Sequence, residues 1–325
     1  MDHGMVANGL PVTRASRRVK LARSWRRNRF AYALVAPAIL FMLVVHIAPT
    51  VAGIYLAFLD VNLFTFHLLF RAPWIGLENF RSILFEVDNP LRPGFIDAVR
   101  NTFFYTGWTV AVTLSAGLGV ALLLNRQFPG RRVARTLMLA PWVVPSFVVA
   151  LLWQFMWQSD TGIVNQVLVD YTHVLDERPV WLLGENSIWA IIVPTIWRGL
   201  PFVILIFLAG LQAIPDELYE AAAIDGAGAW GRFRHITLPL LRPLIAIQLL
   251  FGVIWSAYQF AIPFVMLGSN PGPSADLLMT LIVRQAFTNQ LVGYGAAIST
   301  LLMATMLVWV AIWYRAFRRD LVAAT

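Results

Sequence analysis

The sequence contains no cysteine and a single lysine, Lys20. Without cysteine, the chain can form neither a disulfide framework nor a thiolate metal site. Because Lys20 does not stand in a GxxxxGK[ST] pattern, the chain also lacks a phosphate-binding P-loop. Any ATP used by this protein must therefore be hydrolysed by another subunit.

Residue patterns for metal binding and catalysis are missing as well. The five histidines are scattered and show neither HExxH nor paired spacing, so we expect no metal site. The apolar stretches contain no aspartate, glutamate or cysteine from which an intramembrane catalytic pair could be built. The sequence therefore predicts that this chain is not an enzyme.

Charged residues are scarce. They make up 13% of the 325 residues, against 59% hydrophobic residues, which is too little polar surface for a water-soluble globule of this size. The net charge of +8 would suit nucleic acid, but the basic residues lie between apolar runs instead of gathering in one polar domain. The expected solvent is lipid, and no nucleic-acid partner is predicted.

Six apolar stretches are long enough to cross a bilayer. A hydrocarbon core about 30 Å thick needs about 20 apolar residues in a helix, where each backbone N–H finds a partner within the segment. The sequence predicts an all-α membrane protein with a transmembrane domain at 30–315, a basic tail at 1–29 and a short tail at 316–325. The six predicted transmembrane helices are 30–59, 102–125, 137–157, 188–211, 244–267 and 293–314.

The distribution of basic residues predicts that both termini are cytoplasmic. Many precede the first apolar run, which is far longer than a signal-peptide core, so we expect an uncleaved first helix. After six crossings, most of the 25 basic residues fall on the N-terminal side, as the positive-inside rule requires. The basic tail could bind anionic membrane lipid, but such a run is more often a disordered, solvated segment that fixes topology.

The loop 214–243, between the fourth and fifth predicted spans, would be cytoplasmic. Pro215 suits the first turn of a helix, two acidic residues after it complement the helix dipole, and Gly226 suits a left-handed helix end. We predict a helix of about three turns here. A second short helix is predicted at 229–237, ended by Pro239.

The first of these helices is expected to contact a partner protein. Its alanines let another backbone approach closely, and its acidic residues offer charges to a basic partner. The alternative is a surface hairpin that only joins two spans. The expected docking residues are Glu220, Ala221, Ala222, Asp225, Gly226 and Ala227.

These residues carry a family resemblance. Together with Phe233, Ile236, Leu238, Pro239 and Pro243, they resemble the EAA loop of permease subunits in binding-protein-dependent ABC importers. Further segments resemble the carbohydrate-importing branch, which includes permeases for maltose and for glycerol phosphate: Gly76–Phe80, Asn101–Thr102, Trp197–Phe202 and Tyr294–Gly295. The run Leu267–Gly272 departs from the Thr-Gly-Gly-Gly-Pro-like run of that branch, and the large extracytoplasmic insert of the maltose subunit is absent.

The resemblance implies the fold of a type I ABC importer permease in the bacterial cytoplasmic membrane. The implied partners are a second permease subunit, two ATPase subunits and an extracytoplasmic sugar-binding protein. ATP and Mg would bind the ATPases, and this chain would hold no cofactor. ATP-driven closure of the ATPases would move the first loop helix and switch the cavity from inward to outward access.

Arg198 lies within the fourth predicted span, where a charge facing lipid costs at least about 2.5 kcal/mol, so it should face protein or a water-filled cavity. Pro194, Gly199 and Pro201 around it predict an interrupted helix. Arg198 could then be a pathway residue, or it could pair with a carboxylate or with carbonyls freed at the break. Both interpretations stay open, with the structural one favoured.

The fifth predicted span carries aromatic rings beside amide and hydroxyl groups, a combination that can stack on a sugar ring and bond its hydroxyls. The alternative is that the rings are packing or interface residues and the polar groups bond neighbouring helices. The candidate pathway residues are Arg198, Trp255, Ser256, Tyr258 and Gln259, with Gln248 on the same span.

Other functions fit parts of the pattern. A GxGxxG match at 226–231 follows a helical pattern where dinucleotide binding would need a strand. The whole chain could also be an importer permease for a non-sugar solute such as glycerol phosphate. A secondary transporter would work without an ATPase and would be sensitive to ionophores instead of ATP depletion.

Overall fold

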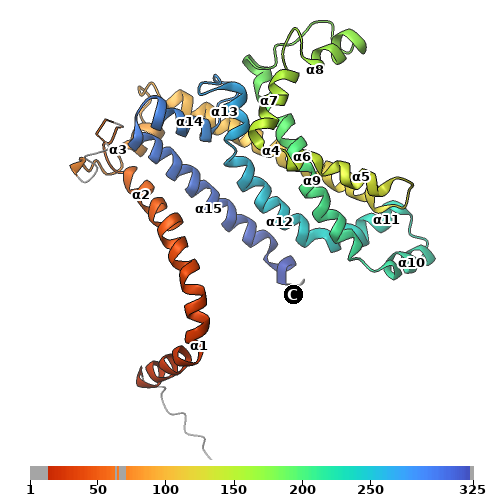
Figure 1. Cartoon of the computed structure of the whole chain (residues 1–325), viewed down its shortest axis with the longest axis horizontal. Coiled ribbons are helices and arrows are strands. Elements are labelled where there is room, and N and C mark those ends of the chain that lie inside the picture. Colours follow the sequence, from red (N-terminus) through yellow and green to blue (C-terminus); the bar gives the residue numbers. More distant parts are fainter. Residues whose placement is uncertain (1–13, 63, 66–70, 323–325) are drawn as a thin grey trace, which may run out of the picture. The chain divides into compact units, whose positions relative to one another are not determined.

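The computed structural model describes residues 14–62, 64–65 and 71–322, which are almost entirely helical (Figure 1). The chain divides into two compact units, Met1–Tyr55 and Leu56–Thr325. The helices that begin in the first unit are α1 (Arg14–Met42), the π-helical turn η1 (Leu43–Ile47) and α2 (Ala48–Leu56).

The predicted first span is confirmed as a long helical run, whose apolar part is Asn28–Leu56. The backbone is already helical from Arg14, so the basic segment before the span forms the first turns of this helix and is not a disordered tail. Residues 1–13 of the predicted tail lie outside the described residues.

The second unit contains the remaining helices. They are α3 (Glu78–Leu84), α4 (Arg92–Asn125), α5 (Arg131–Met138), α6 (Ala140–Val143), α7 (Ser146–Met156), α8 (Ile163–Asn165), η3 (Gln166–Tyr171), η4 (Gly184–Asn186), α9 (Ser187–Gln212), α10 (Asp216–Ile224), α11 (Ala229–Arg232), η5 (Phe233–Thr237), α12 (Leu238–Ala257), α13 (Ala261–Leu267), α14 (Leu278–Val283), η6 (Arg284–Thr288) and α15 (Val292–Val322).

Four helical runs of this unit are long and apolar enough to cross a membrane. Three confirm the second, fourth and sixth predicted spans: Arg92–Asn125, Gly184–Gln212 and Val292–Asp320. The fifth predicted span lies in the run Ala229–Leu267, in which residues 258–260 separate α12 from α13. The apolar sequence pattern therefore located these spans correctly.

The third predicted span, 137–157, is wrong as a single helix. The stretch Arg131–Val143 meets Ser146–Met156 at 96°, with the break at Val144 and Pro145. A residue before proline is kept out of the helical region by the ring, and Val144 is extended, with ψ at 128°. One proline thus turns a predicted span into two helices at nearly a right angle.

The interrupted helix predicted around Arg198 is also wrong, because α9 runs unbroken through Pro194 and Pro201. Proline at position 194 leaves the carbonyl of Ala190 without its helical donor. That carbonyl instead accepts a hydrogen bond from Trp157 Nε1 at 3.1 Å. A neighbouring helix therefore satisfies the group that proline frees, as in other membrane helices.

Two π-helical turns stand just before prolines: Leu43–Ile47 before Pro49 and Phe233–Thr237 before Pro239. In each, the residue directly before the proline donates its N–H to the carbonyl five residues back. Proline has no N–H to donate, so one carbonyl of the preceding turn would lack a partner. The wider π-helical turn accommodates this missing bond, and the helix continues. The prediction that Pro239 ends the second loop helix is therefore wrong, because the run Ala229–Leu267 passes through it.

Helices α4 and α9 pack closely along their length. Gly117 allows this approach, because a Cβ at this position would lie 2.6 Å from Val203 Cγ1. Small residues at such contacts let membrane helices gain van der Waals contact without a hydrophobic driving force between them. The contact fixes α4 and α9 as two neighbouring walls of the bundle.

The loop helices and the C-terminal end of α15 lie at the same end of the second unit (Figure 1). Arg242, near the start of α12, forms an ion pair with Asp320 at 3.2 Å. Farther along the same helix pair, Trp313 Nε1 donates to the carbonyl of Ala246 at 2.7 Å. Helices α12 and α15 are thus joined by two side-chain contacts.

Candidate functional site

A cavity of about 150 Å³ lies among α4, α9 and α12, with contributions from α6 and α13. Its lining combines aromatic rings with hydroxyl, amide and guanidinium groups. Among its lining residues are Thr109, Thr113, Trp142, Thr195, Arg198, Phe202, Gln248, Trp255, Ser256 and Gln259.

The cavity brings together most of the predicted pathway residues. Arg198, Trp255, Ser256 and Gln259 all line it, and so does Gln248. Tyr258, the remaining candidate, does not line this cavity. The sequence pattern of aromatic and polar side chains therefore gathers around one space, and Tyr258 lies apart from it.

Several polar atoms at this cavity are buried without a hydrogen-bond partner among the described residues. They belong to the hydroxyls of Thr109 and Thr113, to Nε of Arg198 and to Nε2 of Gln248. An unsatisfied buried polar group costs about 1–3 kcal/mol, so such groups are ordinarily paired. A cluster of them facing one cavity is what a site for water or a polar solute would provide.

Arg198 does not have the partner that the structural interpretation requires. None of the ion pairs in the described part of the chain includes it, and its Nε is buried and unpaired. Helix α9 is unbroken, and although Pro201 leaves the carbonyl of Trp197 without its helical donor, Arg198 donates to no carbonyl in the described part of the chain. Its placement at the cavity therefore agrees better with the pathway interpretation.

Sequence reasoning did not identify any threonine of α4 as a cavity residue. Thr102, Thr106, Thr109 and Thr113 recur at spacings of three and four residues, so they share one face of the helix. All four are buried. This periodic stripe is the signal that could have identified Thr109 and Thr113 as cavity residues.

Aromatic side chains cover one side of the cavity. The ring of Phe202 stacks on Trp142 at 6.0 Å and meets Trp255 edge-on at 5.7 Å, measured between ring centroids. Trp255 also lies 5.7 Å from Phe251. Trp255 remains 59% exposed, so its ring face is available for contact with a solute.

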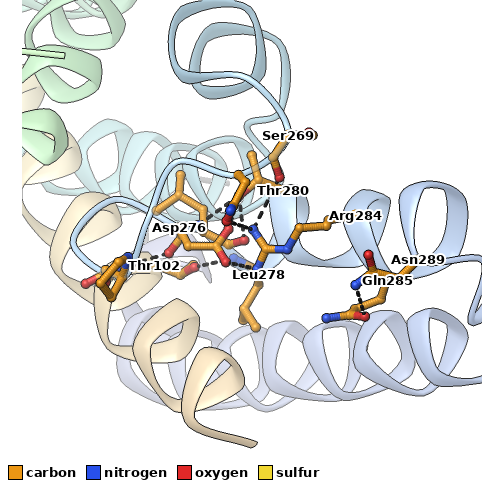
Figure 2. Close-up of polar contacts among 12 residues, drawn as sticks. Thr102, Ser269, Asp276, Leu278, Thr280, Arg284, Gln285 and Asn289 are labelled. Carbon is orange, nitrogen blue, oxygen red and sulfur yellow. Dashed lines mark hydrogen bonds and ion pairs between the residues drawn. The ribbon is translucent and has the colours of Figure 1, made fainter. Parts of the chain in front are cut away.

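A second polar cluster fixes the segment between α13 and α14 (Figure 2). Asp276 forms a buried ion pair with Arg284 and accepts a hydrogen bond from Thr280 at 2.8 Å. The pKa of the Asp276 carboxyl is raised above its usual value, mainly by burial. The Arg284 guanidinium and the Thr280 hydroxyl act in the opposite direction and offset only part of this rise. Asn101 and Thr102 of α4 tie the same segment down by hydrogen bonds to Pro273, Asp276 and Leu278.

The first loop helix, α10, has the predicted ends with one change. Pro215 precedes the helix and is not part of its first turn. At the other end, Gly226 takes a left-handed φ of 78° and donates to Ala223, while Ala227 donates to Ala222 at 2.8 Å. This pair of bonds is a Schellman motif, which requires the left-handed residue that glycine adopts most easily.

The loop presents an exposed surface. Of the six expected docking residues, Glu220, Ala221, Asp225 and Gly226 are exposed, and the remaining two are half-buried. Sequence reasoning missed the large apolar side chains beside them, Leu218, Ile224 and Trp230, of which Ile224 is 88% exposed. Exposed apolar groups gathered on one surface are typical of a contact with another protein or with the membrane.

The loop helices are held to each other by a side-chain contact. The hydroxyl of Tyr219 in α10 lies 3.0 Å from Thr237 Oγ1 in η5. Within the described residues, no group of three or more histidines or acidic residues is placed to hold a metal ion. The features with functional chemistry are therefore the polar cavity and the exposed loop.

Comparison with known proteins places this geometry in context. Residues 112–322 match the family model described as "Binding-protein-dependent transport system inner membrane component". The chain is 32% identical over 91% of its length to the trehalose/maltose transport system permease protein MalF of Thermococcus litoralis, covering 97% of that protein. It is 35% identical over 89% of its length to the sulfoquinovosyl glycerol transport system permease protein SmoG of Agrobacterium fabrum, covering 90% of that protein.

A solved structure has the same fold. A chain of the bacterial alginate ABC transporter, crystallised in complex with an alginate pentasaccharide-bound periplasmic protein, matches with a TM-score of 0.77 and 24% identity. The match covers 93% of this chain and 98% of that one.

Proposed function

Because the chain belongs to the family of binding-protein-dependent transport system inner membrane components, we propose that it is the permease subunit of an ATP-driven importer that moves a carbohydrate delivered by an extracytoplasmic binding protein. The relatives named for trehalose or maltose and for sulfoquinovosyl glycerol support this solute class. The transmembrane permease domain would be 30–315, in a bacterial cytoplasmic membrane with both termini cytoplasmic.

The observation that carries the solute class is the chemistry of the cavity. Carbohydrates carry hydroxyls around the edge of the ring and apolar C–H groups on its faces, so they need donors and acceptors beside aromatic rings. The cavity offers unpaired polar atoms on Thr109, Thr113 and Gln248, with Trp255 nearby. Arg198 adds a cation, which would favour a solute with acidic or strongly polar groups.

We propose that the loop is the docking element for a partner ATPase. The alanine-rich helix α10 would enter a cleft on that subunit, with contacts through Glu220, Ala221, Ala222, Asp225, Gly226 and Ala227. ATP and Mg would bind only the ATPases, and this chain would catalyse no covalent step. The complete assembly would also contain a second permease subunit, a second ATPase and the binding protein.

The fold gives a physical route from loop to cavity. The loop helix α11 continues through η5 into α12 without a break, and α12 lines the cavity with Gln248, Gly252 and Trp255. The Tyr219–Thr237 contact joins α10 to this run. Movement of α10 by an ATPase would therefore shift one wall of the cavity directly.

The assembled importer in proteoliposomes provides the test. Trp255→Ala should reduce uptake of the carbohydrate carried by the binding protein, because it removes the exposed ring face, while leaving basal ATP hydrolysis unchanged. Uptake that survives ATP depletion but stops with an ionophore would show a secondary transporter and overturn the proposal. Unchanged uptake in the Trp255→Ala variant would show that the cavity is not part of the solute pathway.

A further inference from the structure

Helix α5 differs from the spanning helices in that its basic and apolar side chains lie on opposite faces. Its three arginines, Arg131, Arg132 and Arg135, share one face, whereas Val133 and Leu137 on the opposite face are 61% and 67% exposed. The stretch that contains it makes an angle of 96° with the following helix, so both cannot run along the membrane normal. A short basic amphipathic helix of this kind is typical of the membrane interface.

A basic hollow of about 530 Å³ opens at the start of α5. Arg131, Arg132 and Arg135 line it, together with Gln127, Phe128 and Gly130. None of the ion pairs formed within the described part of the chain involves these arginines. The hollow therefore gathers positive charge without a carboxylate to balance it.

A second hollow, of about 310 Å³, lies between the end of α4, the α5–α6 segment and α9. Apart from Arg135, Thr136 and Gln212, its lining is apolar and includes Leu124, Met138, Leu139, Ile204, Leu205 and Leu208. Arg135 lines both hollows. Its Nη2 donates to the carbonyl of Leu124 at 3.0 Å, while its Nε is buried without a partner.

We propose that these two hollows, which share Arg135, form a binding site for one anionic phospholipid. The lipid phosphate would lie among Arg131, Arg132 and Arg135, and an acyl chain would follow the apolar hollow along α9 past Leu205. A free anion would use only the basic hollow, and a neutral lipid only the apolar one. An anionic phospholipid has both groups in one molecule, and a bilayer interface supplies it at the depth of an amphipathic helix.

The first experiment measures the unfolding temperature of the purified, detergent-solubilised transporter as lipid is added. Phosphatidylglycerol should raise the temperature saturably, because a ligand that binds only the folded state stabilises it. Phosphatidylcholine of the same chain length and inorganic phosphate at the same concentration should not. An equal rise with phosphatidylcholine, or a full rise with inorganic phosphate alone, would overturn the proposal.

Two sets of variants separate headgroup from chain. Arg131→Gln with Arg132→Gln should weaken phosphatidylglycerol binding about thirtyfold, from two lost charges near the surface. The control, Arg318→Gln with Arg319→Gln, removes the same charge at exposed positions of α15 and should have no such effect. Leu205→Trp, which fills the apolar hollow and keeps every arginine, should also weaken binding. If the α15 control lost as much phosphatidylglycerol binding, the effect would come from net charge alone, and the proposed site would be refuted.

Another protein subunit is the remaining candidate occupant of the apolar hollow, and the chain's lack of cysteine allows a clean test. Leu205→Cys would carry the only thiol of this chain. In the membrane-embedded transporter it should react with a lipid-soluble maleimide and should form no cross-link to another subunit through a short bifunctional reagent. A cross-link to a partner subunit would show that protein fills the hollow and would overturn the proposal.

Discussion

Gln248 of α12 is 4% exposed, and its amide nitrogen has no partner in the described part of the chain. Such a group lowers the stability of the protein by its lost hydration, so stability alone gives no reason for an amide there. Gln248 lines the cavity with Thr109 and Thr113, and the proposed role of this cavity in solute passage would give a functional reason.

Replacing this amide should separate stability from transport. Gln248→Met keeps the size of the side chain and removes the unpaired donor, so the free energy of unfolding should stay the same or rise by about 1 kcal/mol. Carbohydrate uptake should fall. Thermal unfolding and uptake measured on the same preparation provide the check, and a large loss of stability would contradict the absence of a protein partner for this amide.

The Asp276–Arg284 pair is expected to be the most sensitive ionic contact in the structure. Its side chains are 5% and 14% exposed, so Asp276→Ala leaves a buried guanidinium uncompensated and should cost about 3–5 kcal/mol. The Glu78–Arg81 pair is a control, because its side chains are 53% and 67% exposed. Glu78→Ala should cost less than about 1 kcal/mol. Equal effects in chemical denaturation would contradict the role of burial.

Residue composition predicted the cavity only in part. Trp255, Ser256 and Gln259 were found because aromatic and polar groups rarely stand together in a lipid-facing helix. Thr109 and Thr113 were missed because a threonine in a helix can bond its own backbone and so signals little by itself. Their partners, or lack of them, are set by α9 and α12, far away in sequence.

At the scale of elements, prolines explain both successes and failures of prediction. Pro145 breaks a predicted span, whereas Pro194 and Pro239 lie in continuous helices. At Pro194 the carbonyl that the proline leaves free has another donor, and at Pro239 a π-helical turn accommodates the ring. For Pro194 the donor is Trp157, which belongs to another helix, so local sequence could not reveal it.

The end of α10 allows a sharp test with two glycines. Gly226 has a φ of 78°, whereas Gly228 has a φ of −67°, and an added Cβ meets nothing within 4 Å at either position. Gly226→Ala should cost about 1 kcal/mol in the isolated fold and reduce carbohydrate-stimulated ATP hydrolysis, because a left-handed alanine loosens the helix end. Gly228→Ala, at the N-cap of α11, should cost about 0.5 kcal/mol and leave stimulated ATP hydrolysis unchanged. If both substitutions changed stimulated ATP hydrolysis to the same extent, the left-handed end of α10 would have no specific role in coupling.

Stronger changes in the same helix address docking itself. Gly226→Pro or Ala222→Arg should abolish coupling between the cargo-loaded binding protein and ATP hydrolysis, because they distort or block the surface expected to enter the ATPase. Membrane insertion should be normal, since neither residue lies in a spanning helix. Unchanged stimulated hydrolysis in either variant would refute the docking role.

At the scale of the whole molecule, the α4–α9 contact supports the cavity walls. Gly117→Ala would place a Cβ 2.6 Å from Val203 Cγ1, so the helices must separate or Val203 must move, at a cost of about 1–3 kcal/mol. Gly119→Ala is the control, because nothing lies within 4 Å of its added Cβ. Yield and unfolding temperature in detergent should fall for the first variant only. A similar decrease for both would show that the close approach is unimportant.

The sequence predicted the helical class and most span positions, because lipid imposes a length and a composition on every spanning helix. It could not predict the packing that joins α12 to α15, since that depends on contacts between distant segments. The 96° turn before α7 has a local cause, Pro145, but the neighbouring sequence did not distinguish this proline from those that lie in continuous helices. The transmembrane pattern therefore specifies where apolar helices lie better than how they bend and pack.

Of the two contacts that join α12 to α15, the Arg242–Asp320 ion pair is exposed and weak, so the buried bond between Trp313 and Ala246 is taken as the fixed point of the α11–α12 run. Counted at 1.5 Å per residue, Trp230 lies about 24 Å before that point and Trp255 about 14 Å after it. If the run turns about this bond as a stiff rod, a push at the loop reaches the cavity reversed in direction and reduced to roughly six-tenths of its stroke. The α11–α12 run would then act as a lever with unequal arms, whose cavity end moves a shorter distance than its loop end but with greater force.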